Sequence, residues 1–244
     1  MTVATRSVAT AALAAAVALA GYLHPTALVG AGFVLVVLLA LGWPWLARLP
    51  FPPGSSAVIG LAGAGALYAV AFVTASSDLS ALSIAMAAAL LLAFVNELLR
   101  RDGRVRMVES VSGTAAGAVI ALTASGWAAA DALSGGPTLV VTGAVALAVG
   151  SAVSALAVAR WVSAVTTVLS AAGVGALVSI PLASFSPAVG ALLGGAVGVL
   201  VAAMDALFDG MPELRRRMPA LAAIALPVCV TGMVLYVVGR VLVR

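Results

Sequence analysis

The chain has 244 residues, of which 64% are hydrophobic and 8% are charged, and its net charge is +4. A soluble domain carries roughly 25% charged residues, so this composition excludes a water-soluble fold. All twelve basic residues are arginine, and their small excess over acidic residues is not typical of a nucleic-acid-binding protein.

Apolar stretches of about 20 residues recur along the whole chain, and each is long enough to cross a hydrocarbon core of ~30 Å. Proline begins several of these stretches, as at Pro25 and Pro187, and Gly103 and Gly210 follow two of them, where a helix end favours glycine. We therefore predict a single all-α membrane domain over residues 1–244. Its nine spans are 7–23, 26–47, 56–75, 79–101, 107–133, 137–159, 161–184, 187–209 and 219–242.

The first and last spans each have an alternative. The first follows Arg6 and ends in Ala18-Leu19-Ala20, which is similar to a signal-peptide cleavage site, but the next span begins almost at once, which favours a retained helix. Pro227 lies inside the last span and predicts a kink there, with a re-entrant segment as the alternative. Either alternative reduces the number of spans to eight.

The arginines predict the orientation, because loops on the cytoplasmic side are enriched in basic residues. With the N-terminus in the cytoplasm, ten of the twelve arginines fall on that side, and Arg240 and Arg244 fall on the other. Most of the ten lie in or beside hairpin loops near 100–106 and 210–218. Arginine without lysine, in a chain rich in alanine, valine and glycine, is typical of a GC-rich bacterial genome. We therefore predict a multi-pass protein of the bacterial inner membrane.

The two arginine clusters are candidates for binding anionic lipid headgroups, since a basic residue near such a surface contributes about 1 kcal/mol. Topology and helix capping are the simpler explanation, and Glu97, three and four residues before two of the arginines, predicts an intrahelical ion pair. The candidate headgroup or anion ligands are Arg100, Arg101, Arg104, Arg106, Arg215, Arg216 and Arg217.

Three further polar residues flank the first cluster. Asn96 and Glu97 lie one turn before the end of the fourth span, and Glu109 begins the fifth. If the junction after the fourth span meets the acidic end of the eighth, these three residues form a candidate polar site between the two junctions.

The end of the eighth span carries Asp205 and Asp209 on one helical face, where negative charge opposes the helix dipole. Arg215 to Arg217 are the simple compensation, and a Mg²⁺ or Mn²⁺ ion carrying a phosphate is the alternative. The stretch DALFDGMPELRRR resembles the carboxylate motif of CDP-alcohol phosphatidyltransferases in its two aspartates before glycine. Its spacing is one residue longer and the Ala-Arg that should follow is absent. The number of spans resembles that of phosphatidate cytidylyltransferases, whose C-terminal signature is missing. No residue is assigned from either family.

Ionisable residues are absent near the middle of every predicted span, which argues against a transporter coupled to ions through a buried charge. The polar groups at membrane depth are hydroxyls, which bond within or between helices or line a path for a polar solute. They include Thr114, Ser151, Ser154, Ser163, Thr166 and Thr167. The one histidine, His24, is expected at the interface, and the one cysteine, Cys229, cannot form an intramolecular disulfide.

Glycines at four-residue spacing, Gly113 and Gly117 in the fifth span and Gly190, Gly194 and Gly198 in the eighth, predict close helix packing. That packing lies inside the bundle or, alternatively, in a homodimer or membrane complex. Taken together, the sequence favours a permease-like or accessory protein that moves or organises a lipid or small solute. The alternatives are a metal-dependent lipid-phosphate enzyme and a structural subunit of the cell envelope.

Overall fold

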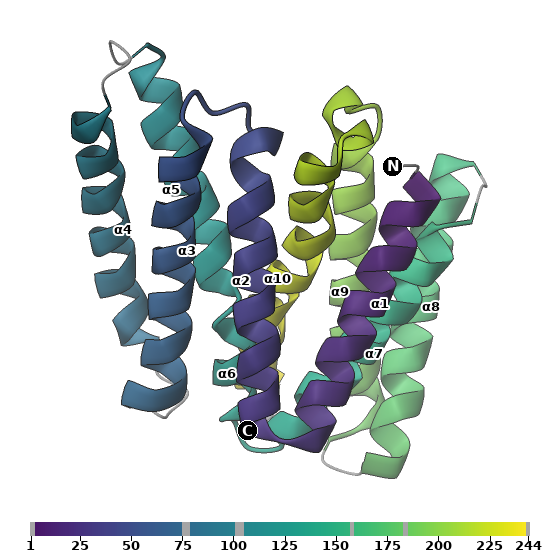
Figure 1. The fold of residues 1–244 in the computed structure, drawn as a ribbon. Helices are drawn as coiled ribbons and strands as arrows, with labels where there is room; N and C mark the ends of the chain where they lie inside the picture. Colours follow the sequence, from purple (N-terminus) through teal and green to yellow (C-terminus); the bar gives the residue numbers. More distant parts are fainter. Residues whose placement is uncertain (1–2, 75–78, 101–104, 157–158, 183–184, 243–244) are drawn as a thin grey trace.

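The computed structural model describes residues 3–74, 79–100, 105–156, 159–182 and 185–242, and every regular element in these ranges is a helix (Figure 1). Nine segments in them are long and apolar enough to cross a membrane, which confirms the predicted all-α bundle. The α-helices are α1 (Val3–Leu23), α2 (Pro25–Leu46), α3 (Pro52–Tyr68), α4 (Ser80–Leu99), α5 (Met107–Thr123), α6 (Gly126–Asp131), α7 (Gly136–Ser154), α8 (Arg160–Leu182), α9 (Pro187–Phe208) and α10 (Arg217–Leu242).

Two of the nine spans are composite. The π-helical turn η1 (Ala69–Thr74) extends α3, and α6 continues the direction of α5 after a break at Ala124 and Ser125. A short 3₁₀-helix, η2 (Pro212–Arg215), precedes α10. Side-chain caps begin some helices: the Nδ1 atom of His24 accepts the backbone N–H of Thr26 at 3.2 Å.

Prolines do not end every helix that contains them. The sequence analysis named Pro227 as a proline inside a span, and in the structure Pro44 in α2 and Pro181 in α8 also lie inside helices. Helix α10 continues through Pro227 and reaches the end of the bundle opposite the N-terminus (Figure 1). The re-entrant alternative for the last span is therefore wrong.

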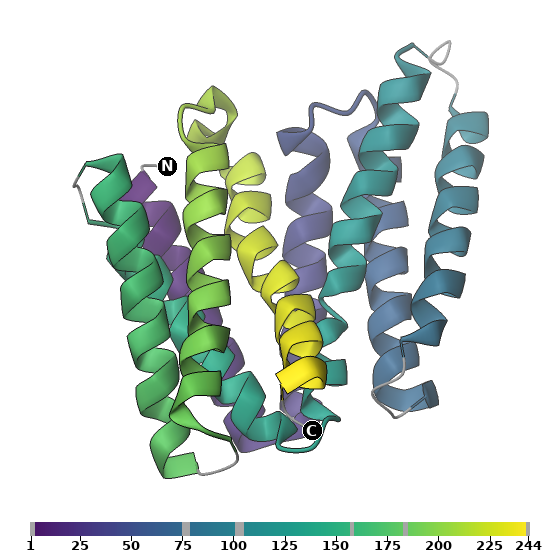
Figure 2. The same ribbon diagram turned by 180° about the vertical axis from the view of Figure 1, so that it is seen from behind.

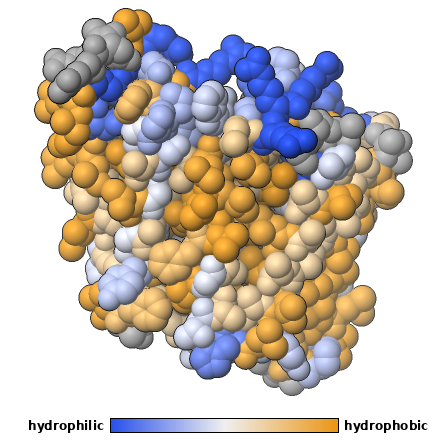
Figure 3. Space-filling model, in the orientation of Figure 1, coloured by the Kyte–Doolittle hydropathy of each residue, from blue (hydrophilic) through white to orange (hydrophobic). Residues whose placement is uncertain are grey.

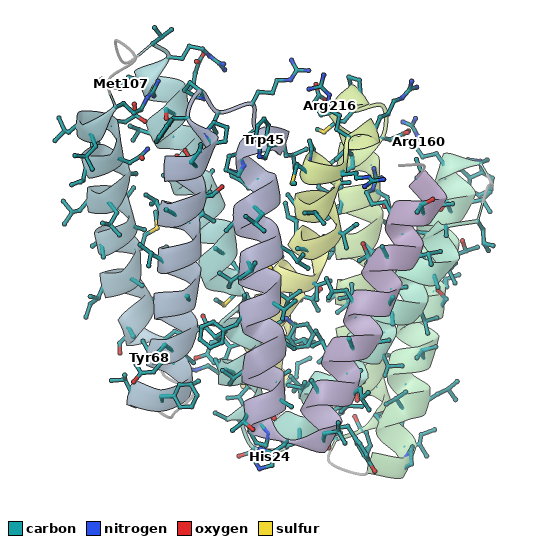
Figure 4. All side chains as sticks on the ribbon, in the orientation of Figure 1. His24, Trp45, Tyr68, Met107, Arg160 and Arg216 are labelled. Atoms are coloured by element: carbon teal, nitrogen blue, oxygen red, sulfur yellow. The ribbon has the colours of Figure 1, made fainter. Side chains whose placement is uncertain are left out.

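The two ends of the bundle differ in charge. The start of α1, Arg160 and Arg216 lie at one end, and His24 and Tyr68 lie at the other (Figures 1 and 4). Hydrophilic side chains gather at the first end, and a broad hydrophobic belt covers the middle of the molecule (Figure 3). We call the first end the arginine-rich end, because α1, α8 and α10 begin there and α2 and α4 finish there, each with an arginine in or beside its last or first turn.

The helices form two groups around a central pair. Helices α3, α4 and α5 stand on one side, α1, α7, α8 and α9 on the other, and α2 and α10 pack together between them (Figures 1 and 2). Helix α10 is the most buried span. The glycines at four-residue spacing serve this packing: Gly190 and Gly194 lie against Gly175 and Ala171 of α8, and Gly117 lies against Trp43. These glycine faces are therefore occupied within the chain.

Candidate functional site

Two clusters of buried charged residues lie at the arginine-rich end, one in each group of helices. In the first, Glu97 of α4 and Arg100, which directly follows that helix, are 3% and 6% exposed and form an ion pair of 2.6 Å. The hydroxyl of Ser110 on α5 donates to the other oxygen of Glu97, and the Nη2 atom of Arg100 donates to the carbonyl of Val105 at 3.2 Å. The predicted intrahelical pair is confirmed, and its partners are provided within the protein.

The other residues predicted near this cluster lie in different surroundings. Asn96 packs over Gly54 of α3, and its buried Nδ2 atom has no hydrogen-bond partner among the described residues. Glu109 is exposed and paired with Arg106. Helices α5 and α9 lie on opposite sides of α2 and α10 (Figures 1 and 2), so Glu109 does not face the acidic end of α9 as expected. Arg101 and Arg104 lie outside the described residues.

The second cluster joins α1, α7 and α9. Its basic member is Arg6, which the sequence reading placed before the first span and treated as an orientation signal. Helix α1 begins at Val3, so Arg6 lies in its first turns, 5% exposed, and its guanidinium carbon is 5.5 Å from the centroid of the Phe208 ring. Such a contact stabilises a desolvated cation by about 2 kcal/mol.

Arg6 and the acidic member of the cluster, Asp205 of α9, both line a small inner cavity of about 10 Å³. This volume is about what one water molecule needs. Four polar atoms at the cavity have no hydrogen-bond partner among the described residues: Arg6 Nη2, Ser7 Oγ, Ser151 Oγ and Asp205 Oδ2. Pro227 also borders the cavity, and because proline has no N–H it leaves the carbonyl of Ala223 without its helical donor. The inner cavity therefore holds polar atoms whose hydrogen bonds no described residue provides.

A larger outer cavity, of about 380 Å³, shares Ser154 and Asp205 with the inner one. It lies between the ends of α1, α7, α8 and α9, and Arg160 and Asp209, which form an ion pair, are at its exposed side. Ser163 and Thr167 of α8 line its wall, and the buried hydroxyl of Thr167 has no partner in the part of the chain that is described. We call these two neighbouring cavities the recess; it lies at the arginine-rich end, and Arg6 lines its inner part.

The aspartates are compensated by different arginines from those predicted. Asp209 pairs with Arg160 of α8, and Arg6 acts electrostatically on both Asp205 and Asp209. The sequence had offered Arg215 to Arg217, because they are near in the chain, whereas Arg160 and Arg6 are near only in the fold. A cation lies near each carboxylate, and the described ranges contain no group of three His, Cys, Asp or Glu side chains. Binding of Mg²⁺ or Mn²⁺ at Asp205 and Asp209 stays a prediction.

Four of the hydroxyls expected at membrane depth, those of Ser151, Ser154, Ser163 and Thr167, do line the recess. The other two do not: Thr114 bonds Ser55 of α3 at 2.9 Å, and Thr166 donates to the carbonyl of Val162. Sequence reasoning missed the contribution of α1. A signal was present, since Arg6, Ser7 and Thr10 form a polar face on an otherwise apolar helix.

The chain matches no family model, no curated protein and no solved structure.

Proposed function

We propose that this chain is a permease-like membrane protein that admits a small polar solute into the recess between α1, α7, α8 and α9. One observation carries the proposal. Of the seven buried side-chain atoms without a hydrogen-bond partner among the described residues, five belong to residues of the recess: Arg6, Ser7, Ser151, Thr167 and Asp205. An unsatisfied buried polar group costs about 1–3 kcal/mol, and a polar ligand or water removes that cost.

The chemistry of the outer cavity indicates the class of solute. Its volume is within the range of small-molecule sites, roughly 300–1,000 Å³. Asp205 has a buried carboxylate oxygen with no partner among the described residues, and Ser154, Ser163 and Thr167 add hydroxyls to the lining of the cavity. These groups favour a solute that bears an ammonium group or several hydroxyls, with Arg6 behind Asp205 balancing its charge.

We place the arginine-rich end on the cytoplasmic side of a bacterial inner membrane, by the positive-inside rule. Ser134 is exposed in the loop between α6 and α7, at the opposite end of the bundle. A Ser134→Cys variant in a Cys229→Ala background should react with a membrane-impermeant thiol reagent in intact cells. Leu156→Cys, at the arginine-rich end, should react only after lysis. The reverse pattern of labelling would contradict this orientation.

Transport is tested in two stages. Purified protein is first screened by thermal shift against polyols, amines, amino acids and carboxylates, and a solute that stabilises the wild type but not Asp205→Asn is selected. Counterflow of that solute is then measured in proteoliposomes, with Glu109→Gln as the control, because Glu109 lies outside the recess. Uptake by the wild type and the control but not by Asp205→Asn supports a permease. A solute that binds without being exchanged, or a screen in which none binds, contradicts the proposal and favours a structural subunit.

A further inference from the structure

Another cavity at the arginine-rich end is separate from the recess and shares no lining residue with it. It has a volume of about 700 Å³ and lies between the end of α2, the start of α3 and the segment from η2 into α10. Its apolar wall includes Trp45 and Met218, and its charged residues are Arg48, Glu213, Arg216 and Arg217. We call it the Trp45 cavity. Figure 4 shows Trp45 and Arg216 on neighbouring elements at this end of the molecule.

The loop after α2 that bounds the cavity is held by contacts from three directions. The backbone N–H of Leu49 donates to the carbonyl of Pro44 at 2.8 Å, and the side chain of Arg48 pairs with Glu213 of η2. The Nη1 atom of Arg106 donates to the carbonyl of Arg48 at 3.2 Å. Elements distant in the sequence therefore fix the shape of the cavity.

Arg48 occupies a backbone conformation that favours glycine. Its φ angle is 51°, in the left-handed region, where a residue with a Cβ atom is less stable by roughly 1–2 kcal/mol. Glycine is the usual residue at such a position after a helix. An arginine here brings a positive charge to the cavity and positions Glu213 through their ion pair.

The charges in the cavity are unbalanced. Three arginines and one glutamate line it, which gives a net charge of +2. Arg48 is engaged with Glu213, whereas Arg216 and Arg217 are exposed and, among the residues that the structure describes, form no ion pair. Two cations with no acidic partner therefore stand beside an apolar wall.

We propose that the Trp45 cavity binds an anionic phospholipid, with the phosphate between Arg216 and Arg217 and the start of an acyl chain along Trp45 and Met218. The position supports a lipid rather than a soluble anion. Trp45 and Met218 are each 50% exposed, Trp45 lies at the arginine-rich end (Figure 4), and tryptophan favours the membrane interface. The site is independent of the proposed transport, since Asp205 and Arg6 lie elsewhere.

The experiment measures the affinity of detergent-solubilised protein for short-chain phosphatidylglycerol, short-chain phosphatidylcholine and inorganic phosphate. Arg216→Gln/Arg217→Gln is compared with Arg215→Gln/Arg240→Gln, which removes the same charge from residues outside the cavity. We expect phosphatidylglycerol to bind most tightly to the wild type. The first double variant should lose about 25-fold in affinity, at roughly 1 kcal/mol per arginine and 1.4 kcal/mol per tenfold, while the second stays within about twofold of the wild type.

Three results would overturn the site. Equal affinity for phosphatidylglycerol and phosphatidylcholine removes the role of charge, and equal losses in the two double variants show a non-specific surface effect. Phosphate binding as tight as that of the lipid shows a soluble-anion site instead. Trp45→Ala separates the two ligands further, because it should weaken phosphatidylglycerol and leave phosphate unchanged. If the double variant does not fold, Arg216→Gln against Arg215→Gln provides the same comparison, with an expected loss of about fivefold.

Discussion

The two buried charge clusters lie at the same end of the bundle, but they differ in how their polar groups are satisfied. Glu97 and Arg100 bond each other, and Ser110 and the carbonyl of Val105 take up further hydrogen bonds. In the recess, Asp205 and Arg6 line the same small cavity, and each leaves an atom without a partner in the described structure. The first cluster is complete without a ligand, and the second is not.

Because of this difference, we expect one cluster to serve the stability of the fold and the other to serve ligand binding. A buried polar group that has its partners contributes to a single well-defined fold, whereas a buried group without them costs free energy unless something else binds it. Substitutions in the cluster of Glu97 and Arg100 should therefore change the stability of the protein strongly. Substitutions in the recess should change the stability little and the affinity for a ligand strongly.

The largest expected effect is at Glu97. Replacing one partner of a buried ion pair leaves the other charge uncompensated, which costs about 3–5 kcal/mol. Glu97→Gln should reduce the free energy of unfolding by that amount, as measured by titration with a denaturing detergent in mixed micelles. Glu109→Gln is the matched control, because Glu109 forms a pair of the same spacing with Arg106 at the surface, where a pair contributes about 0.2–1 kcal/mol.

Removing both charges sharpens this test. Apolar replacement of a complete buried pair is often nearly neutral, so Glu97→Met/Arg100→Met should be more stable than Glu97→Gln alone. Equal losses in the free energy of unfolding for Glu97→Gln and Glu109→Gln would show that Glu97 and Arg100 do not form the buried pair described above.

The spans were predictable because each is a local pattern. About 20 apolar residues between proline, glycine and arginine signals define a span, and the pair of Glu97 with Arg100 follows from helical spacing. The recess was only partly predictable. Its hydroxyls were recognised as polar groups at depth, but Arg6 and Arg160 lie far along the chain from Asp205 and Asp209, and only the packing of α1 and α8 brings them there. Nearness in sequence suggested Arg215 to Arg217 instead.

A smaller effect is expected where α8 holds α9, the helix that carries Asp205. A Cβ atom at Gly194 would overlap the backbone carbonyl of Ala171, whereas one at Gly195 would lie 3.8 Å from the side chain of Ala172. Gly194→Ala should therefore destabilise the protein by about 1–3 kcal/mol through overpacking. Gly195→Ala should leave the melting temperature unchanged or raise it slightly. Similar melting temperatures for the two variants would mean that the α8–α9 contact is looser than described.

The smallest change in stability is expected at Asp205 itself. Its Oδ2 atom has no partner to lose in the described structure. Asparagine loses the attraction of Arg6, but its neutral amide is less costly to bury than a carboxylate, which offsets that loss. Asp205→Asn should therefore alter the free energy of unfolding by less than about 1 kcal/mol, against the several kcal/mol expected at Glu97. The same samples test the metal alternative. Mg²⁺ and Mn²⁺ should not shift the melting temperature of the wild type, because Arg6 and Arg160 already offset the two aspartates. A metal-dependent rise in the wild type that is absent in Asp205→Asn would instead support the lipid-phosphate enzyme. A large loss of stability in Asp205→Asn without any ligand would show that the recess, like the cluster at Glu97, is structural.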